Sequence, residues 1–307
     1  MERSSLATST ADAVADQFAA DRAAVDAALQ ALCARGLSGV PNDVSAAIRY
    51  SMLGEGKRLR ALLLLAAYRA SGGDGNANPL AAAVEIVHAY SLVHDDLPCM
   101  DDDDVRRGRP TTHKVHGAVV AATAGIAMVP LAARAACDAG AALGLPAAAR
   151  GDIVRELMRA SGAGGMVGGQ LLDLAGEGHT LSLADLERVH GAKTGALIAA
   201  SVRIGGIAAR TNATRADALD RYGRAVGLAY QIADDVLDVT STTAQLGKTA
   251  GRDAALGKST YPALLGIPGA VARADALTRE ACDALRKHGV LTPALERLAR
   301  FVVLRTS

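Results

Sequence analysis

The sequence predicts an all-α fold, an antiparallel bundle of roughly ten helices. Three observations support this prediction. Ala, Leu, Arg and Glu, which are strong helix formers, fill most segments. Alternating stretches of β-branched residues, which would indicate strands, are nearly absent. Glycine clusters stand where helices should end, for example at 72–75, 162–165 and 176–178.

The individual helices are expected from helical periodicity in chain order. The segments with this pattern are 12–35, 59–70, 80–93, 153–161, 183–203 and 217–238. The uncharged run 117–133 is interpreted as a buried helix, because it falls short of the ~20 apolar residues that a membrane span needs. With 2 Phe and no Trp, the core must consist mainly of aliphatic side chains, which allows helices to approach closely.

Composition indicates one soluble domain covering residues 1–307. The hydrophobic content of 50% suffices for a sizeable core, and no Pro/Gly/Ser-rich linker divides the chain. The net charge of +1 does not favour nucleic-acid binding. The four cysteines have no metal-ligand spacing and are typical of reduced thiols, and no secretory signal is visible, so a cytoplasmic location is expected.

Two aspartate clusters lie about 140 residues apart, each directly after a largely apolar, helix-like stretch. The first runs from Asp95 to Asp104 and holds six aspartates, and the second contains Asp234, Asp235 and Asp238. Two unit charges ~4 Å apart repel by roughly 4 kcal/mol at an effective dielectric near 20. A solvated acidic loop would explain one such cluster, but a second cluster with its own apolar approach favours a shared cation.

The two clusters differ in their expected geometry. Asp234 and Asp238 are four residues apart and share a helix face, with Gln231 on the same side. Asp95 and Asp101 are six apart, so both face one site only if the helix ends between them. Pro98 predicts that break, followed by a loop that returns Asp101 towards Asp95.

The ligand chemistry favours Mg²⁺ as cofactor. Both clusters offer oxygen ligands only, and Mg²⁺ takes one or two carboxylates together with water and substrate phosphates. Calcium is the alternative, although neither cluster has the spacing of an EF-hand loop.

Basic residues accompany the aspartates and indicate a polyanionic ligand. Gly54 to Arg60 is a glycine-flanked basic turn that opens a helix, where backbone N–H groups and the helix dipole favour phosphate, although a solvated surface turn is the commoner reading of such a turn alone. Arg106, Arg107 and Arg109 follow the first cluster directly. Further cations are Lys193, Lys248 and Lys258, and His88 lies on the helical face of Asp95.

These segments together resemble the trans-polyprenyl diphosphate synthases, and most closely the bacterial farnesyl diphosphate synthase branch. The resemblance extends over residues 46–265, in order and at matching intervals. The segments that carry it are EIVHAYSLVHDDLPCMDDDDVRRGRPTTHK (85–114), GKRLR (56–60), GGQLLDL (168–174), KTGALI (193–198), YQIADDVLDV (230–239) and LGKTAGRDAALGKSTYPALLG (246–266).

The resemblance implies a fold of isoprenoid synthase type, with the aspartate motifs facing each other across a deep central cavity, and usually a homodimer. It implies that Mg²⁺ is bound by Asp95, Asp96, Asp101, Asp234, Asp235 and Asp238. The allylic diphosphate would be held with help from Arg106, Lys193, Lys248 and Lys258. Isopentenyl diphosphate would be held by Lys57, Arg60, His88 and Arg107, while Thr194 and Gln231 would line the reacting end.

The implied reaction needs no side-chain nucleophile. Metal and cationic groups stabilise the departing diphosphate, the isopentenyl double bond attacks the allylic cation, and a proton is lost. Tyr90, five residues before Asp95, would form the floor of the cavity and limit the product to fifteen carbons. Packing against a neighbouring helix also explains a tyrosine there, and geranylgeranyl diphosphate synthase is the second candidate.

Some features depart from the family pattern. Glu55 stands where Gly is common, Ala61 where Pro is usual, and Ile126 replaces an Asp. For Ile126 we expect altered helix packing or altered support of the residues around the site, not a loss of the chemistry. A terpene cyclase would share the fold, but its second metal motif is usually of Asn/Ser/Glu type. A noncatalytic partner subunit would be expected to lack one of the aspartates or lysines, and all are present here.

Overall fold

The computed structural model describes residues 17–241 and 257–304, and this part of the chain is almost entirely helical. Its helices are, in chain order, α2 (Ala19–Gly36), α3 (Asn42–Met52), α4 (Leu59–Ala70), α5 (Asn78–Asp95), α6 (Thr112–His116), α7 (Ala118–Ala142), α8 (Ala147–Ser161), α9 (Met166–Ala175), α10 (Leu183–His190), a π-helix η1 (Gly191–Gly195), α11 (Ala196–Ala208), α12 (Ala213–Thr240), α15 (Tyr261–Arg286) and α16 (Pro293–Leu304). Within the described residues the strands are β1 (Val105–Arg106) and β2 (Arg109–Pro110), one antiparallel pair. The all-α prediction is confirmed.

The predicted helix 183–203 is interrupted by the π-helix η1. The chain there reads Gly191, Ala192, Lys193, Thr194 and Gly195. Glycine at both ends lowers the cost of leaving α-helical geometry, and single π turns of this kind occur often at functional sites. The interruption displaces Lys193 and Thr194 from the register that a continuous α-helix would give them.

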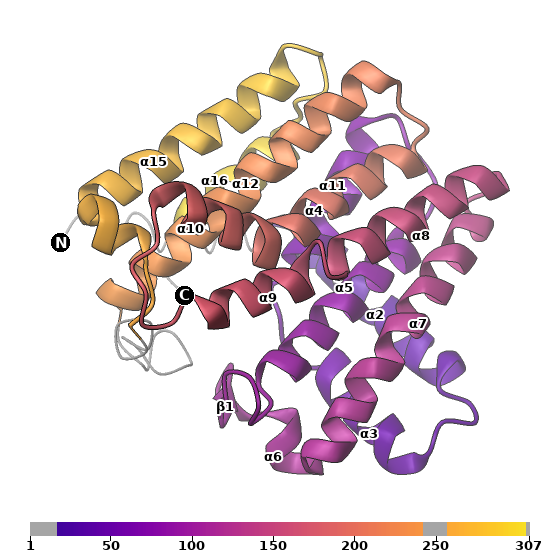
Figure 1. Ribbon diagram of the computed structural model, residues 1–307. Helices are drawn as coiled ribbons and strands as arrows, with labels where there is room; N and C mark the ends of the chain where they lie inside the picture. The colour runs from indigo at the N-terminus through magenta and orange to yellow at the C-terminus, as the bar shows by residue number, and fades with distance from the viewer. Residues whose placement is uncertain (1–16, 242–256, 305–307) are drawn as a thin grey trace.

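Two large clusters of mostly aliphatic buried residues form most of the interior, and a small third cluster contains Val93, Leu97 and Ala121. One large cluster joins α2, α3, α5, α7 and α8, and the other joins α12, α15 and α16. Helices α4 and α11 pack against each other and place residues in both large clusters. In Figure 1, α11 and α4 accordingly lie in the middle of the bundle, with α15 and α12 on one side and α5, α7 and α8 on the other.

The helix expected over residues 117–133 is present as α7, but it is longer and less buried than expected. The helix continues past Pro130 to Ala142, and it is the one helix in the described residues that is long and apolar enough to meet the criteria for a membrane span. Moreover, only 39% of its most apolar window is buried. Val119 and Ile126 are 81% and 65% exposed, so Ile126 does not alter packing within this chain.

Candidate active site

The first aspartate cluster begins where α5 ends. Asp95 is the last residue of the helix, and the following residues form a tight loop. The backbone N–H of Asp101 donates to the carbonyl oxygen of Asp95 at 2.9 Å, and Asp102 bonds to Leu97 in the same way at 3.1 Å. The predicted return of Asp101 towards Asp95 is therefore confirmed, and the helix ends before Pro98 as predicted.

Helix α9 contributes two polar residues that the sequence analysis did not single out. The Nε2 atom of Gln170 donates to Oδ1 of Asp101 at 3.3 Å. Asp173, three residues later on the same helix, receives hydrogen bonds from Nζ of Lys193 at 2.7 Å and from Nζ of Lys258 at 2.9 Å. Both residues belong to the GGQLLDL segment, and their i, i+3 spacing was the signal that could have indicated a shared face.

This arrangement charges the site strongly. Burial would raise the pKa of Asp173, but Lys193 and Lys258 together lower it to about 2. Nζ of Lys258 also lies 3.4 Å from Oε1 of Glu177, so the two ammonium groups face two carboxylates. Such a pair of lysines is suited to binding phosphate oxygens.

Close helix contacts place η1 against α9 and α12. A Cβ atom on Gly169 of α9 would lie 2.1 Å from the backbone N of Lys193, and one on Gly227 of α12 would lie 2.7 Å from Cα of Gly195. Only glycine allows these approaches. They bring α9 and α12 against the segment that carries Lys193 and Thr194, which is partly buried.

The second cluster lies in the last turns of α12. Asp235 and Asp238 are 3% and 4% exposed, and Asp234 is partly buried. The Oδ2 atom of Asp235 accepts from the backbone N–H of Tyr261 at 3.0 Å, and Oδ1 accepts from Nε2 of Gln231 at 3.4 Å. Asp235 thus caps the first turn of α15 in this structure, a contact that the helix-face argument did not predict.

The first cluster carries negative charge that the protein compensates only in part. Burial raises the pKa of Asp95 to about 6, against the lowering effect of Lys193, and Asp101 and Asp96 add to the rise. Arg106 contacts one oxygen of Asp96 at 2.6 Å and Oδ2 of Asp103 at 3.1 Å. A cation bound here would stabilise the charged carboxylates, and oxygen donors of this kind suit Mg²⁺.

A second region of the site has excess positive charge. A guanidinium nitrogen of Arg107 lies 3.4 Å from Nε2 of His88, and another donates to the carbonyl oxygen of Glu55 at 2.7 Å. The pKa of His88 falls well below its usual value because of burial and because Arg60 and Arg107 are close. Burial also lowers the pKa of Arg60. Within the described residues, Nδ1 of His88 and Nε of Arg60 have no hydrogen-bond partner, so both nitrogens are available to donate to a bound anion.

The basic turn before α4 separates into structural and exposed cations. Arg58, which was not predicted as a site residue, is 8% exposed and donates to Asp26 at 2.8 Å and to the carbonyl oxygen of Gly54 at 2.7 Å. Its left-handed φ of 51° turns the chain into the helix. Lys57 is exposed, and its Nζ lies 6.0 Å from the ring centroid of Phe301.

Tyr90 lies one turn before Asp95, with 8% exposure. Its ring meets that of His94 edge-on, with the centroids 4.7 Å apart. A Cβ on Gly125 of α7 would come within 2.4 Å of the His94 ring, so the glycine provides room for the histidine. Tyr90 therefore packs against His94, which in turn lies against Gly125 of α7. The remaining predicted ligand, Lys248, lies outside the described residues.

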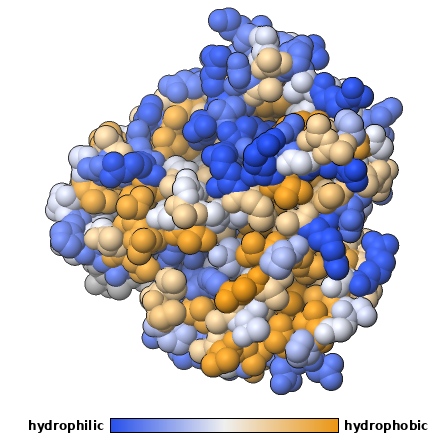
Figure 2. Space-filling model, turned by 45° about the vertical axis from the view of Figure 1, so that its right-hand side comes forward, coloured by the Kyte–Doolittle hydropathy of each residue, from blue (hydrophilic) through white to orange (hydrophobic). Residues whose placement is uncertain are grey.

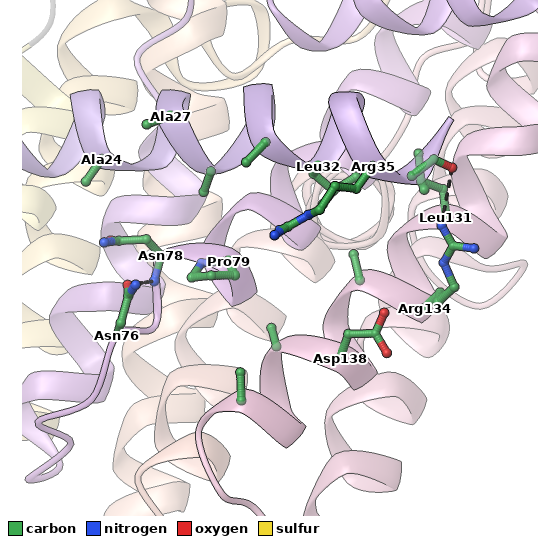
Figure 3. A pocket seen from close by; sticks show the side chains of 16 residues that line it. Ala24, Ala27, Leu32, Arg35, Asn76, Asn78, Pro79, Leu131, Arg134 and Asp138 are labelled. Carbon is green, nitrogen blue, oxygen red and sulfur yellow. Dashed lines mark hydrogen bonds between the residues drawn. The ribbon is translucent and has the colours of Figure 1, made fainter. Parts of the chain in front are cut away.

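A separate groove of about 880 Å³ lies between α2, α7 and the start of α5. Figure 3 shows Ala24 and Ala27 of α2 on the side of Asn78 and Pro79, and Leu32 and Arg35 of α2 on the side of Leu131 and Asp138 of α7. A guanidinium nitrogen of Arg134 donates to the carbonyl oxygen of Gly36 at 3.2 Å. None of the predicted site residues in the described part of the chain lines this groove. It does not belong to the candidate site.

Comparison with known proteins identifies relatives over most of the chain. The profile of the family described as polyprenyl synthetase matches residues 41–296. Farnesyl diphosphate synthase of Escherichia coli K12 is 46% identical over 266 residues, which cover 84% of this chain and 88% of that protein. Geranylgeranyl pyrophosphate synthase 9 of Arabidopsis thaliana chloroplasts is 44% identical over 249 residues, covering 80% and 69%. The crystal structure of a geranyltransferase from Helicobacter pylori, complexed with magnesium and isoprenyl diphosphate, aligns with a TM-score of 0.76 at 30% identity, covering 87% and 89%.

Proposed function

Because this chain belongs to the polyprenyl synthetase family, we propose that it is a trans-prenyltransferase that condenses isopentenyl diphosphate with dimethylallyl or geranyl diphosphate to give farnesyl diphosphate. One observation carries the proposal most directly. The first aspartate cluster lies near Lys193, whose charge acts on Asp95, the segment of Lys193 packs against α12, which carries the second cluster, and a separate arginine and histidine cluster can hold a second anion. Two anionic substrates and one metal-binding region are what this condensation requires.

We propose Mg²⁺ as the cofactor, held by the six aspartates of the two clusters. The incompletely compensated carboxylates of the first cluster support this assignment, as does the magnesium in the related geranyltransferase structure. When bound, the ions polarise the allylic diphosphate and stabilise it as a leaving group. Asp235 would then give up its hydrogen bond from the backbone N–H of Tyr261 in order to bind the metal. Alternatively, it would keep this bond and hold the end of α12 in place while Asp234 and Asp238 bind the metal.

The lysines and Arg106 would hold the allylic diphosphate. Lys193 and Lys258 are already positioned together by Asp173, and Lys248 is proposed to join them on family resemblance alone. Arg106 is paired with Asp96, so it lies beside the proposed metal ligands. Positive charge held in place before ionisation stabilises the leaving diphosphate without further reorganisation.

Isopentenyl diphosphate would bind to Arg60, Arg107 and His88, with Lys57 at the exposed edge. The partnerless buried nitrogens of Arg60 and His88 support this role, because a diphosphate would satisfy both. Thr194 and Gln231 would line the space between the two substrates. The carbon–oxygen bond of the allylic diphosphate breaks first and gives an allylic cation, the double bond of isopentenyl diphosphate then attacks this cation to form the carbon–carbon bond, and the proton lost passes to the released diphosphate.

Geranylgeranyl diphosphate is the second candidate product. The 44% identity to a chloroplast geranylgeranyl pyrophosphate synthase favours keeping it, since that relative is nearly as similar as the Escherichia coli farnesyl synthase. Tyr90 supports the shorter product because its buried ring occupies space one turn before Asp95. We therefore base the proposed length of the product on the buried Tyr90 side chain and not on overall sequence identity.

We further propose that the chain is a single domain and a cytoplasmic homodimer. Helices α4 and α11 contribute to both large buried clusters, which supports one domain, and the four cysteines are free thiols, as expected in a reducing compartment. The exposed apolar side chains of α7 support a partner. Figure 2 shows apolar side chains gathered on the lower part of the face towards which α7 turns. A second copy would cover them.

The decisive experiment is an assay of the purified chain with isopentenyl diphosphate and either allylic primer. The products are dephosphorylated and separated by chromatography. We expect a fifteen-carbon main product with Mg²⁺ and none when EDTA removes the metal. Absence of condensation with Mg²⁺ would refute the proposed activity, and a twenty-carbon main product would replace it with the second candidate.

A further inference from the structure

A cluster of metal-binding groups lies next to the proposed catalytic aspartates but involves different residues. One carboxylate oxygen of Asp102, one of Asp104 and a ring nitrogen of His113 all lie within 4.8 Å of one another. His113 belongs to α6, and both aspartates belong to the loop that precedes β1. In Figure 1, β1 and α6 lie beside each other at one end of the bundle. None of the three residues has a role in the proposed reaction.

The hydrogen bonds around His113 determine which ring nitrogen is available. The hydroxyl of Thr111 donates to the carbonyl oxygen of Asp103 at 2.7 Å, so its proton is already used. The contact of 3.1 Å between that hydroxyl oxygen and Nδ1 of His113 then requires Nδ1–H as the donor. The neutral ring consequently carries its lone pair on Nε2. A histidine whose Nδ1–H is held in this way is the usual form of a metal ligand.

The Nε2 atom is buried without a partner. His113 is only 6% exposed, and within the described residues nothing hydrogen-bonds to Nε2. A buried acceptor in this state is unfavourable unless something satisfies it. Two exposed carboxylates beside a buried imidazole with a nitrogen lone pair form a mixed nitrogen and oxygen donor set, which an acidic surface cluster alone would lack.

We propose that Asp102, Asp104 and His113 form a second, separate cation site, which binds a transition-metal ion of the Zn²⁺ type. An imidazole ligand favours Zn²⁺ over Mg²⁺, which prefers oxygen ligands. Because the three ligand atoms lie within 4.8 Å of one another, a point midway between them is at most about 2.8 Å from each. If the exposed aspartate side chains move by less than about 1 Å, an ion at this point can have the ~2.0–2.2 Å bonds that are typical of zinc. Nζ of the exposed Lys114 lies 2.7 Å from Oδ1 of Asp104. A bound ion would either displace this lysine or share the carboxylate with it.

The bound ion would tie the loop of the first aspartate cluster to α6. A backbone hydrogen bond already joins this loop to the start of α6. The N–H of Thr111, the residue just before α6, donates to the carbonyl oxygen of Asp104 at 3.0 Å. Asp101 and Arg106 lie on either side of the two aspartate ligands. The ion therefore acts as a structural clamp on the position of these two residues.

The test is calorimetric titration of the full chain with ZnCl₂, in a millimolar excess of MgCl₂ and without substrate, so that Mg²⁺ occupies the oxygen-only sites. We expect one Zn²⁺ per chain for the wild type and loss of this binding in His113→Gln. Asp104→Asn should weaken binding by about tenfold or more, and Thr111→Val, which removes the acceptor for Nδ1–H, by about 10-fold to 100-fold. Asp102→Asn is a further ligand variant, because asparagine tolerates the left-handed φ of 48° at this position.

His116→Gln is the matched control. Within residues 17–241 and 257–304 its Nε2 is also buried without a partner, and it lies on the same short helix, but no pair of carboxylates there forms a metal-binding group with it. This variant should bind Zn²⁺ like the wild type. If His113→Gln fails to fold by circular dichroism, the exposed Asp104 and Asp102 variants decide the question. Absence of Zn²⁺ binding in the wild type, or equal binding in the wild type and all ligand variants, would overturn the proposal without affecting the proposed prenyltransferase activity.

Discussion

The backbone N–H of Asp101 is hydrogen-bonded to the carbonyl oxygen of Asp95 at 2.9 Å. This bond closes the loop at the end of α5 and brings the last aspartate of the first motif back to the first one. It therefore concentrates negative charge at one helix end. The consequence is measurable in the metal-free protein.

Asp95→Asn should remove a destabilising charge when no divalent ion is present. Burial raises the pKa of Asp95 from 3.8 to about 6, so the folded state holds this proton more tightly than the unfolded state. The resulting stability is complete below pH 3.8 and is lost as the pH rises through about 6. In EDTA at pH 7.5 the variant should be more stable than the wild type by up to about 3 kcal/mol, and the two should converge at acidic pH.

Urea unfolding at several pH values measures this difference, with Asp43→Asn on the exposed start of α3 as control. The same Asp95 variant should have no condensation activity with Mg²⁺. A variant that is less stable than the wild type at pH 7.5 would contradict the charge argument, and full activity would contradict the metal assignment.

Asp173→Asn should release both lysines of the site. Lys193 and Lys258 hold the pKa of Asp173 at about 2 against the effect of burial, so its contribution to stability is present above its usual value of 3.8 and is lost as the pH falls through about 2. At pH 7 the variant should lose about 2 kcal/mol of unfolding free energy. Because the lysines lose their common anchor, kcat/KM for the allylic substrate should fall by about 10-fold to 100-fold.

Asp138→Asn, an exposed residue of the groove beside α2, is the control for this measurement and should change neither quantity. Unchanged kinetics in Asp173→Asn would show that the lysines reach their positions without the carboxylate. An unchanged free energy of unfolding would contradict the pKa of Asp173.

Tyr90→Ala should lengthen the product. The tyrosine ring is buried next to His94, and its removal opens space one turn before Asp95. We expect twenty-carbon and longer products by chromatography after dephosphorylation, with a loss of stability of about 3 kcal/mol. Tyr50→Phe, whose ring lies elsewhere beside His116, should keep the wild-type product. An unchanged product in the folded Tyr90 variant would mean that another residue forms the floor.

Charged residues on the exposed face of α7 should separate the proposed dimer. Val119 and Ile126 are 81% and 65% exposed and lie seven residues apart on the helix. Light scattering after gel filtration should give twice the chain mass for the wild type and one chain mass for Val119→Glu combined with Ile126→Glu. Val271→Glu, at a position of 40% exposure on α15, should remain dimeric. A monomeric wild type, or one that sediments with lipid vesicles, would point to another use of this face.

The local pattern of apolar residues and glycines in the sequence was sufficient to predict most of the helices. The bounds of α4 matched the prediction at both ends, because a glycine-rich basic turn precedes it and a glycine pair follows it. The break after Asp95 was also predictable, since Pro98 excludes a continuous helix. The π-helix η1 was not, because its cause is the approach of α9 and α12 to Gly191–Gly195, which are contacts between segments distant in sequence.

The sequence by itself determined the all-α fold, the two aspartate clusters and the family, since helix propensity and motif spacing are local properties of the chain. Only the tertiary structure decided how the charges pair. It joined Asp173 to two lysines, Asp235 to the first turn of α15 and Arg106 to Asp96, and it left His88 and Arg60 with partnerless buried atoms. Pairing depends on distance and burial between segments up to 85 residues apart, and neither quantity can be obtained from the order of residues alone.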